Sequence, residues 1–174
     1  MDNLKLIDTL LDEMKKRLGI DGKIQLEQWI NQKSKNQVFT AMHYAAYRGN
    51  INTIKRLIDF KADYESLNKR GINAIHMACQ GNKPNSLVYL KEKCLMDIQS
   101  VDELKSTPLH WACYNGSEAC IMYLLSWEVS LNLQDNEGLT PLHLAVLSGL
   151  LNFLFKFWKI FEIVFLFLLT GFTS

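Results

Sequence analysis

The 174-residue sequence has almost no charge imbalance and no block of like charge. Its formal net charge is +1. Residues 1–149 hold 17 Lys or Arg and 17 Asp or Glu, because Lys156, Lys159 and Glu162 lie beyond them. Proteins that bind nucleic acid generally carry a basic patch or stripe. We therefore expect no nucleic-acid partner.

Motifs of catalysis and cofactor binding are also missing. The sequence has no Gly-rich phosphate loop, no Ser/His/Asp arrangement and no metalloprotease helix motif. Its four cysteines lack paired short spacings such as C-x-x-C, and aspartates interrupt the first apolar residues, where a signal peptide would be uncharged. We expect a non-catalytic cytoplasmic protein with reduced thiols, no metal and no cofactor.

What the sequence does contain is a repeat. The four histidines recur at spacings of 33, 34 and 33 residues, each in a similar phrase: Thr40-Ala-Met-His43, Asn73-Ala-Ile-His76, Thr107-Pro-Leu-His110 and Thr140-Pro-Leu-His143. A fixed period near 33 is typical of stacked supersecondary units. Consecutive histidines would lie one unit apart, on the order of 10 Å, too far to share a metal ion. We interpret them as side chains that hydrogen-bond the turn and tie adjacent repeats.

Each unit reads as two helices. An alanine follows two residues after each histidine, where a small side chain permits close helix packing. Cys79 and Cys113 share the next position, so we expect them in the core. Glycines five or six residues after the histidine predict a left-handed end to the first helix: Gly49, Gly81, Gly116 and Gly149. A second helix follows, and in the second repeat Pro84 is placed near its start.

These residues resemble the ankyrin repeat over positions 38 to about 150. The resemblance implies an all-α solenoid of helix-turn-helix units that binds other proteins. Lys61 and Glu128 stand where that family has a glycine after the second helix, and Lys105 replaces a turn glycine.

A narrower resemblance is to the ankyrin region of ankyrin-repeat DHHC palmitoyltransferases. It is carried by the phrases around His76, His110 and His143. In that family the ankyrin region recruits substrates on the cytosolic side, and a membrane-embedded Asp-His-His-Cys core catalyses acyl transfer. This sequence has no Asp-His-His-Cys and no Cys/His cluster, so no catalytic residue can be assigned.

We divide the chain into three parts. Residues 1–36 hold two amphipathic stretches, 3–18 and 24–30, and are predicted to cap the exposed end of the stack. Residues 37–149 hold about three and a half repeats.

Residues 150–174 are rich in Phe and Leu. This tail completes a fourth repeat, associates with a membrane through residues 150–172, or is a gene-model artefact. Its length suffices to cross a bilayer, but Lys156, Lys159 and Glu162 nearly cancel the gain from its apolar residues.

The expected binding surface is the concave face formed by the first helices. We predict that it binds a protein or peptide through residues just after each histidine and one turn later: Tyr44, Tyr47, Arg48, Met77, Gln80, Trp111, Tyr114 and Asn115. Tyr, Trp and Arg dominate interface energies. The turn tips Lys69, Arg70, Asn136 and Glu137 are candidate rim contacts.

We expect a monomer. The first alternative function is the substrate-recruiting portion of a membrane palmitoyltransferase. The second is a spacer without a ligand, which would require Trp111 and Tyr114 to be buried.

Overall fold

The computed structural model describes residues 2–18, 22–36 and 38–150 of the chain. These residues form nine helices and no strand, so the all-α prediction is confirmed. Two helices precede the repeats, α1 (Asp2–Leu18) and α2 (Gly22–Ile30). The repeats comprise α3 (Ala41–Arg48), α4 (Ile51–Asp59), α5 (Ala74–Gln80), α6 (Pro84–Cys94), α7 (Pro108–Tyr114), α8 (Glu118–Ser126) and α9 (Pro141–Leu147).

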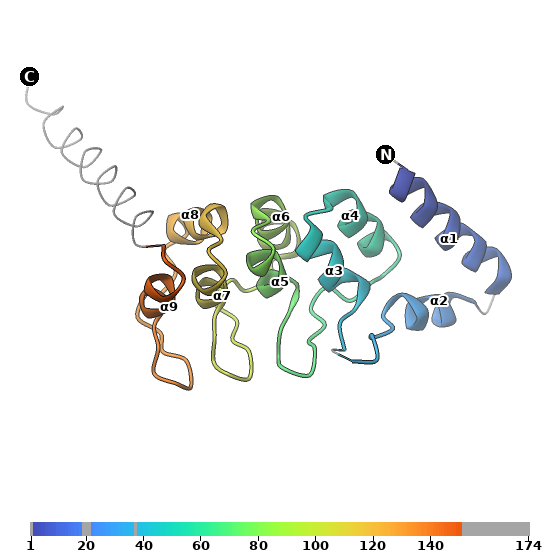
Figure 1. The fold of residues 1–174 in the computed structure, drawn as a ribbon. Coiled ribbons are helices and arrows are strands. Elements are labelled where there is room, and N and C mark those ends of the chain that lie inside the picture. Colours follow the sequence, from blue (N-terminus) through green and yellow to red (C-terminus); the bar gives the residue numbers. More distant parts are fainter. Residues whose placement is uncertain (1, 19–21, 37, 151–174) are drawn as a thin grey trace, which may run out of the picture.

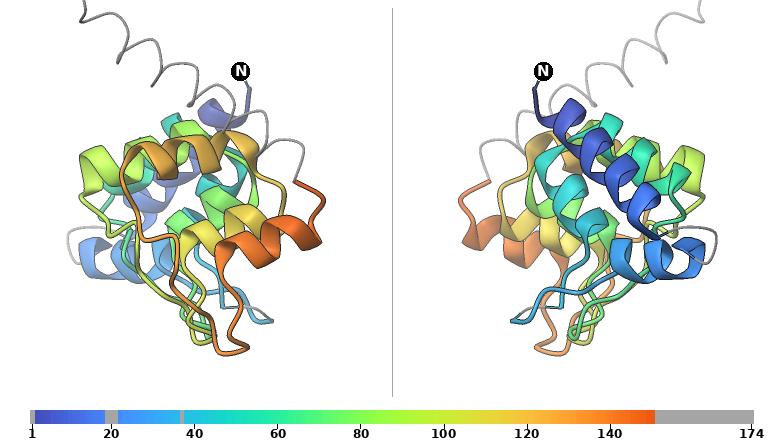
Figure 2. Two further views of the ribbon diagram at one scale, coloured as in Figure 1. Left: turned by 90° about the vertical axis from the view of Figure 1, so that its left-hand side faces the viewer. Right: turned by 90° about the vertical axis from the view of Figure 1, so that its right-hand side faces the viewer.

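The repeats stack in chain order as two layers of helices (Figure 1). The first helices α3, α5, α7 and α9 pack side by side in one layer, which we call the inner layer. The second helices α4, α6 and α8 form the outer layer. Seen along the stack, the connecting loops superpose and project from one edge of the inner layer (Figure 2).

The histidine phrase starts each inner helix by supplying its cap. Thr107, for example, is extended (φ −82°, ψ 167°), and its hydroxyl accepts the His110 main-chain N–H at 3.4 Å. In return the Thr107 N–H donates to His110 Nδ1 at 3.1 Å. A histidine therefore replaces the usual Glu or Gln of a capping box. Prolines at the first helical positions of α6, α7 and α9 lack an N–H that would have no partner there.

The core lies between the two layers. The alanine two residues after each histidine is at most 6% exposed, so neighbouring inner helices pack closely. Outer-layer side chains fill the other side and are fully buried, among them Ile54, Leu87, Leu90 and Leu124. All four cysteines are buried and free, which confirms the core assignment of Cys79 and Cys113.

The inner helices end in a left-handed residue, as predicted, at Gly49, Gly116 and Gly149. The prediction for Gly81 was wrong, because its φ is −82° and the next residue, Asn82, takes the left-handed conformation at φ 49°. Asn82 is six residues after its histidine, like the other three glycines. Gly81 is needed for a different reason, since a Cβ there would collide with the carbonyl oxygen of Tyr47.

Residues that depart from the repeat pattern keep its backbone geometry. Lys61 and Glu128, in place of a glycine after the outer helix, have φ of 65° and 54°. Val38 and Lys105 occupy the turn position that is glycine in the other repeats, both at φ 59°. A side chain in this conformation costs roughly 1–2 kcal/mol, and more when it is β-branched.

The N-terminal helices cover the first repeat. Leu11, Leu26 and Ile30 are buried, and Asp8 on α1 accepts from Arg56 Nε on α4 at 2.6 Å. A capping role for residues 1–36 stays a prediction. At the other end, the three alternatives for residues 150–174 (a fourth repeat, a membrane segment or a gene-model artefact) concern a segment of which only Leu150 lies within the described residues. In the described part of the chain, no helix combines the length and apolar character needed to cross a bilayer.

Candidate protein-binding face

The histidines join each repeat to the next, as predicted. Nε2 of His43 lies 2.9 Å from the carbonyl oxygen of Ile72, and His76 and His110 reach Ser106 and Leu139 in the same way, each at 3.2 Å. The same three carbonyls also accept a main-chain N–H that closes their own loop, from Asn68, Asp102 and Asp135. Each histidine thus anchors the loop of the following repeat.

The hydrogen-bond pattern makes these imidazoles structural. A main-chain N–H donates to Nδ1 of His43 and of His110, so their Nε2 carries the proton that the carbonyl accepts. Burial lowers the pKa of His76 to about 4, against its hydrogen bond to the Ser106 carbonyl, and burial also lowers the pKa of His43. Neutral buried histidines of this kind are not poised for acid–base chemistry near pH 7.

Cys79 and Cys113 are equally unsuited to chemistry. Burial raises the pKa of the Cys79 thiol well above its usual range and that of Cys113 to about 12. The thiolate is the reactive form of cysteine. Among the residues that the structure describes, no three His, Cys, Asp or Glu side chains are grouped so as to hold a metal ion.

Three loops with the same internal bonding form one wall of the face. In each loop one side-chain oxygen of an Asn or Asp accepts two main-chain N–H groups, all at 2.8–2.9 Å. Asn68 accepts from Arg70 and Ile72, Asp102 accepts from Leu104 and Ser106, and Asp135 accepts from Glu137 and Leu139. Neighbouring loops are tied by main-chain bonds, from Glu103 to Arg70 and from Asn136 to Leu104. These bonds hold the loop tips at fixed positions beside the inner helices.

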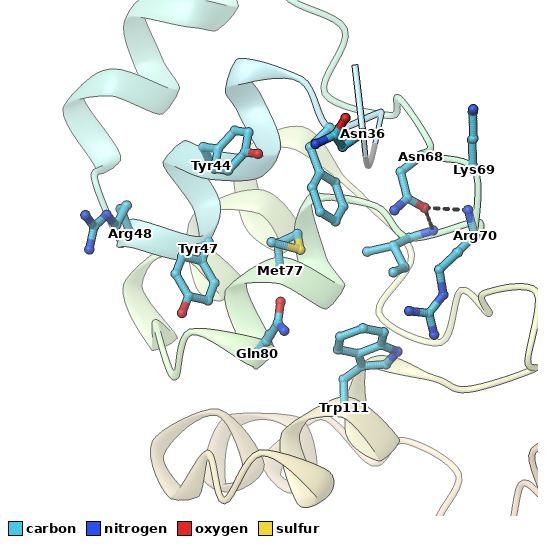
Figure 3. A pocket seen from close by; sticks show the side chains of 12 residues that line it. Asn36, Tyr44, Tyr47, Arg48, Asn68, Lys69, Arg70, Met77, Gln80 and Trp111 are labelled. Carbon is cyan, nitrogen blue, oxygen red and sulfur yellow. Dashed lines mark hydrogen bonds between the residues drawn. The ribbon is translucent and has the colours of Figure 1, made fainter. Parts of the chain in front are cut away.

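A cavity of about 780 Å³ opens between the inner helices and the loops at the first two repeats (Figure 3). We call it the N-terminal cavity. Six of the eight predicted binding residues line it: Tyr44, Tyr47, Arg48, Met77, Gln80 and Trp111. The loop side is formed by Asn68, Lys69 and Arg70, and Phe39 and Ile72 add apolar surface.

A second cavity of about 520 Å³, the C-terminal cavity, continues along the same face at the third and fourth repeats. It shares Arg70, Gln80 and Trp111 with the first cavity and contains the remaining predicted residues, Tyr114 and Asn115. Together the two cavities form one groove. All eight residues proposed from the sequence line this groove, although their role in binding remains a proposal.

The eight residues differ in how much surface they offer. Tyr44, Tyr47 and Tyr114 are 50%, 38% and 66% exposed, but Met77 on α5 is only 4% exposed. Trp111 is half-buried. Its indole N–H donates to Asp102 Oδ2 at 3.0 Å, so part of the Trp111 side chain is used for a contact within its own repeat. The exposure of Tyr114 and the partial exposure of Trp111 do not meet the condition for a ligand-free spacer.

Some groove residues were not anticipated as binding residues from the sequence. Asp102 and Leu104 line the C-terminal cavity, and Phe39 lies in the N-terminal one. A signal for Asp102 did exist, since Asn68, Asp102 and Asp135 recur at spacings of 34 and 33 residues, the period of the histidines. Phe39 shares its repeat position with the apolar Ile72 and Leu139, which is a weaker signal, whereas Leu104 follows no such pattern.

Comparison with protein families decides what this architecture is. A model described as "Ankyrin repeats (many copies)" matches residues 42–90, and one described as "Ankyrin repeats (3 copies)" matches residues 85–157. The chain is an ankyrin-repeat protein. The helix pairs, the bridging histidines and the ordered loops are the ankyrin units of the chain, and the resemblance noted in the sequence is confirmed.

Several larger ankyrin-repeat proteins are similar over the repeats. Palmitoyltransferase AKR1 of Lachancea kluyveri is 28% identical over 113 residues, which are 63% of this chain and 15% of the relative. Inversin of Canis lupus familiaris is 29% identical over 107 residues (61% and 10%). Ankyrin repeat domain-containing protein 53 of Macaca fascicularis is 33% identical over 113 residues (63% and 23%). The match therefore spans between a tenth and a quarter of these relatives.

Proposed function

We propose that this ankyrin chain is a non-catalytic protein-recognition module that binds an extended segment of another protein in the groove along its inner face. The observation that carries the proposal is that the groove collects exposed aromatic residues from the first and third repeats. Tyr44, Tyr47 and Tyr114 lie along it, with Trp111 at the junction of its two cavities. Large aromatic side chains bury much surface at low rotamer cost.

The rigidity of the face supports this proposal. The loop tips are held by main-chain bonds to Asn68, Asp102 and Asp135, so a partner would meet a surface that is already ordered. Pre-organised surfaces lose less conformational entropy on binding, which raises affinity without adding contacts. The proposed partner is therefore a peptide segment or loop, bound by a monomer.

The test begins with binders selected from a random-peptide library displayed on phage, using the full chain as bait. Their affinities are then measured for Tyr114→Ala and for the matched variant Tyr123→Ala, whose ring lies on α8 in the outer layer. We expect Tyr114→Ala to lose about 2 kcal/mol of binding free energy and Tyr123→Ala to lose none. Equal effects of the two substitutions would contradict the assignment of the groove.

Trp111→Ala is a second, less clean test. We expect it to weaken binding by at least about 2 kcal/mol if the indole is a hot spot. Because it also removes the bond to Asp102, its unfolding free energy must be measured in parallel. A folded Trp111→Ala variant with unchanged affinity would remove Trp111 from the binding site.

The alternative function is the substrate-recruiting portion of a palmitoyltransferase, present on the cytosolic face of a membrane. It is favoured by the similarity to AKR1 and to the putative palmitoyltransferase ZDHHC13 of Danio rerio, which is 31% identical over 99 residues. Inversin and ankyrin repeat domain-containing protein 53 match over a similar range, so we prefer the general module. Transcript sequencing that finds transmembrane segments and an Asp-His-His-Cys motif in frame would establish the alternative instead.

A further inference from the structure

The charged residues of the groove are segregated along its length. Among the residues that the structure describes, the N-terminal cavity is lined by three basic residues, Arg48, Lys69 and Arg70, and by no acidic one. Within the same described part of the chain, the C-terminal cavity is lined by three acidic residues, Asp102, Asp135 and Glu137, and by a single basic one, the shared Arg70. The 17 basic and 17 acidic residues of positions 1–149 give no net charge, so this separation is a property of the groove.

Most of these charges are available to a partner. Arg48, Lys69, Arg70 and Glu137 are exposed, and none of them forms an ion pair within 4.0 Å among the residues that the structure describes. Asp102 is buried and accepts bonds with both carboxylate oxygens, so it contributes its charge but no free acceptor surface.

One aromatic and one apolar side chain lie between the two charged ends. Trp111 lines both cavities, and Leu104, which is exposed, lies on the loop between those of Arg70 and Glu137. Leu144 and Leu147 of α9 line the acidic end itself. In Figure 3 the Trp111 ring lies to the lower right of Met77 and Gln80, and the Arg70 side chain is directed towards this ring. The groove therefore offers a basic end, an apolar middle and an acidic end.

Resting on the function proposed above, we infer that the groove selects a bipolar segment, with acidic side chains at one end, an apolar residue in the middle and basic side chains at the other end. Opposite charges across an interface attract and fix register, whereas like charges placed together cost several kcal/mol. A segment with the same composition but mixed charges would place like charges together at both ends.

The dimensions set the length of that segment. Arg70 and Glu137 stand on loop tips two repeats apart, which is roughly 20 Å at about 10 Å per repeat. An extended chain rises about 3.3 Å per residue, so about six residue steps lead from an acidic side chain at one end to a basic side chain at the other. A peptide of about eight residues is therefore long enough to reach both charged ends.

Three synthetic peptides of about this length test the inference. The bipolar peptide has two glutamates, then Ser-Leu-Phe-Ser, then two lysines. The mixed peptide keeps the same central residues and places one glutamate and one lysine at each end. The neutral peptide replaces all four charged residues by serine. Each carries a fluorescent label, and its affinity for the full chain is measured by anisotropy.

We expect the bipolar peptide to bind at least about tenfold more tightly than the mixed peptide at about 50 mM salt, and the ratio to shrink at about 500 mM. Arg70→Glu and Glu137→Lys are each expected to reduce bipolar binding about tenfold. Both side chains can be changed without losing a loop bond, because only their main-chain atoms take part in the loop. Lys93→Glu, an exposed site on α6, is the matched control and should leave the affinity unchanged.

The other outcomes separate this inference from the function on which it rests. Equal affinity for all three peptides, reduced by Tyr114→Ala, would overturn the charge selection and keep the groove as a binding site. No binding of the bipolar peptide would also overturn it, and the library selection would then judge the proposed function alone. Sedimentation of the chain by itself tests a second copy as occupant: a dimer dissociated by Arg70→Glu would overturn the peptide assignment.

Discussion

Replacing His110 by alanine tests the claim that the histidines hold neighbouring repeats together. The imidazole of His110 is fully buried, and it bonds the cap of its own helix through Nδ1 and the loop of the next repeat through Nε2. His143 is its counterpart in the last repeat. Through Nδ1, His143 makes the same bonds to Thr140, but it is exposed, and no carbonyl of a following repeat meets its Nε2 within the described residues.

The expected cost follows from the bonds and the volume lost. His110→Ala removes the inter-repeat hydrogen bond, worth about 1 kcal/mol, and leaves the buried Thr107 N–H without its acceptor, which costs about another 1–3 kcal/mol. The cavity left by the ring adds to this. We expect a loss of about 3 kcal/mol or more in the free energy of unfolding. His143→Ala loses only a solvated cap, so its cost is about 1 kcal/mol or less.

Urea unfolding followed by circular dichroism at the helix band measures both variants. The transition midpoint is the relevant quantity, provided that the slope of the free energy against urea is unchanged. If the two substitutions cost the same within about 0.5 kcal/mol, the inter-repeat bond contributes nothing and the reasoning is refuted.

Three further predictions use the same unfolding assay. Burial lowers the pKa of His76 to about 4, so between about pH 6.5 and 4 the unfolded chain binds a proton that the native chain excludes. The free energy of unfolding should therefore fall as the pH drops through this range, by at most about 3 kcal/mol. His76→Gln should flatten that decline, and an unchanged decline would contradict the assignment. Lys105→Gly should stabilise the chain by about 0.5–1 kcal/mol, because the backbone φ of 59° at this position suits glycine. The control Lys93→Gly should destabilise the chain by about 1 kcal/mol, because glycine is unfavourable within a helix such as α6. Gly81→Ala should reduce the free energy of unfolding more than Gly138→Ala does. A Cβ at position 81 would meet the Tyr47 carbonyl oxygen, whereas a Cβ at position 138 would meet nothing within 4 Å and would be strained only by the φ of 76°. The reverse order would be inconsistent with the close approach of α3 and α5.

The sequence predicts the architecture well because the same local signals recur in every repeat. The histidine phrase specifies a cap, a helix start and an inter-repeat bond at once, so four copies locate four inner helices. In the second copy one of these local signals misleads. Gly81 has the residue type that suits a left-handed conformation, but it lies one residue before the position that adopts it, and Asn82 takes that conformation instead.

The groove is only partly predictable, because exposure depends on neighbours that are distant in sequence. Met77 and Tyr44 occupy the same place in their phrases. Met77 is nevertheless buried, whereas Tyr44 is 50% exposed. Trp111 and Leu144, at the same place in the last two phrases, are half-buried and buried. Similarly, nothing in the sequence around Trp111 indicates that its indole N–H bonds Asp102, nine residues earlier. The charge segregation along the groove requires the loops of three repeats to be seen together.

The paired main-chain bonds accepted by Asn68, Asp102 and Asp135 have a consequence for how this chain can diversify. The residue that shapes each loop is buried or half-buried, whereas Lys69, Arg70 and Glu137 beside it are exposed. Positions 69, 70 and 137 can therefore be changed while the scaffold beneath them stays constant, but Asn136 is different because its side-chain amide donates to the Glu103 carbonyl of the neighbouring loop. A library randomised at positions 69, 70 and 137 should remain folded while its members acquire new ligand preferences.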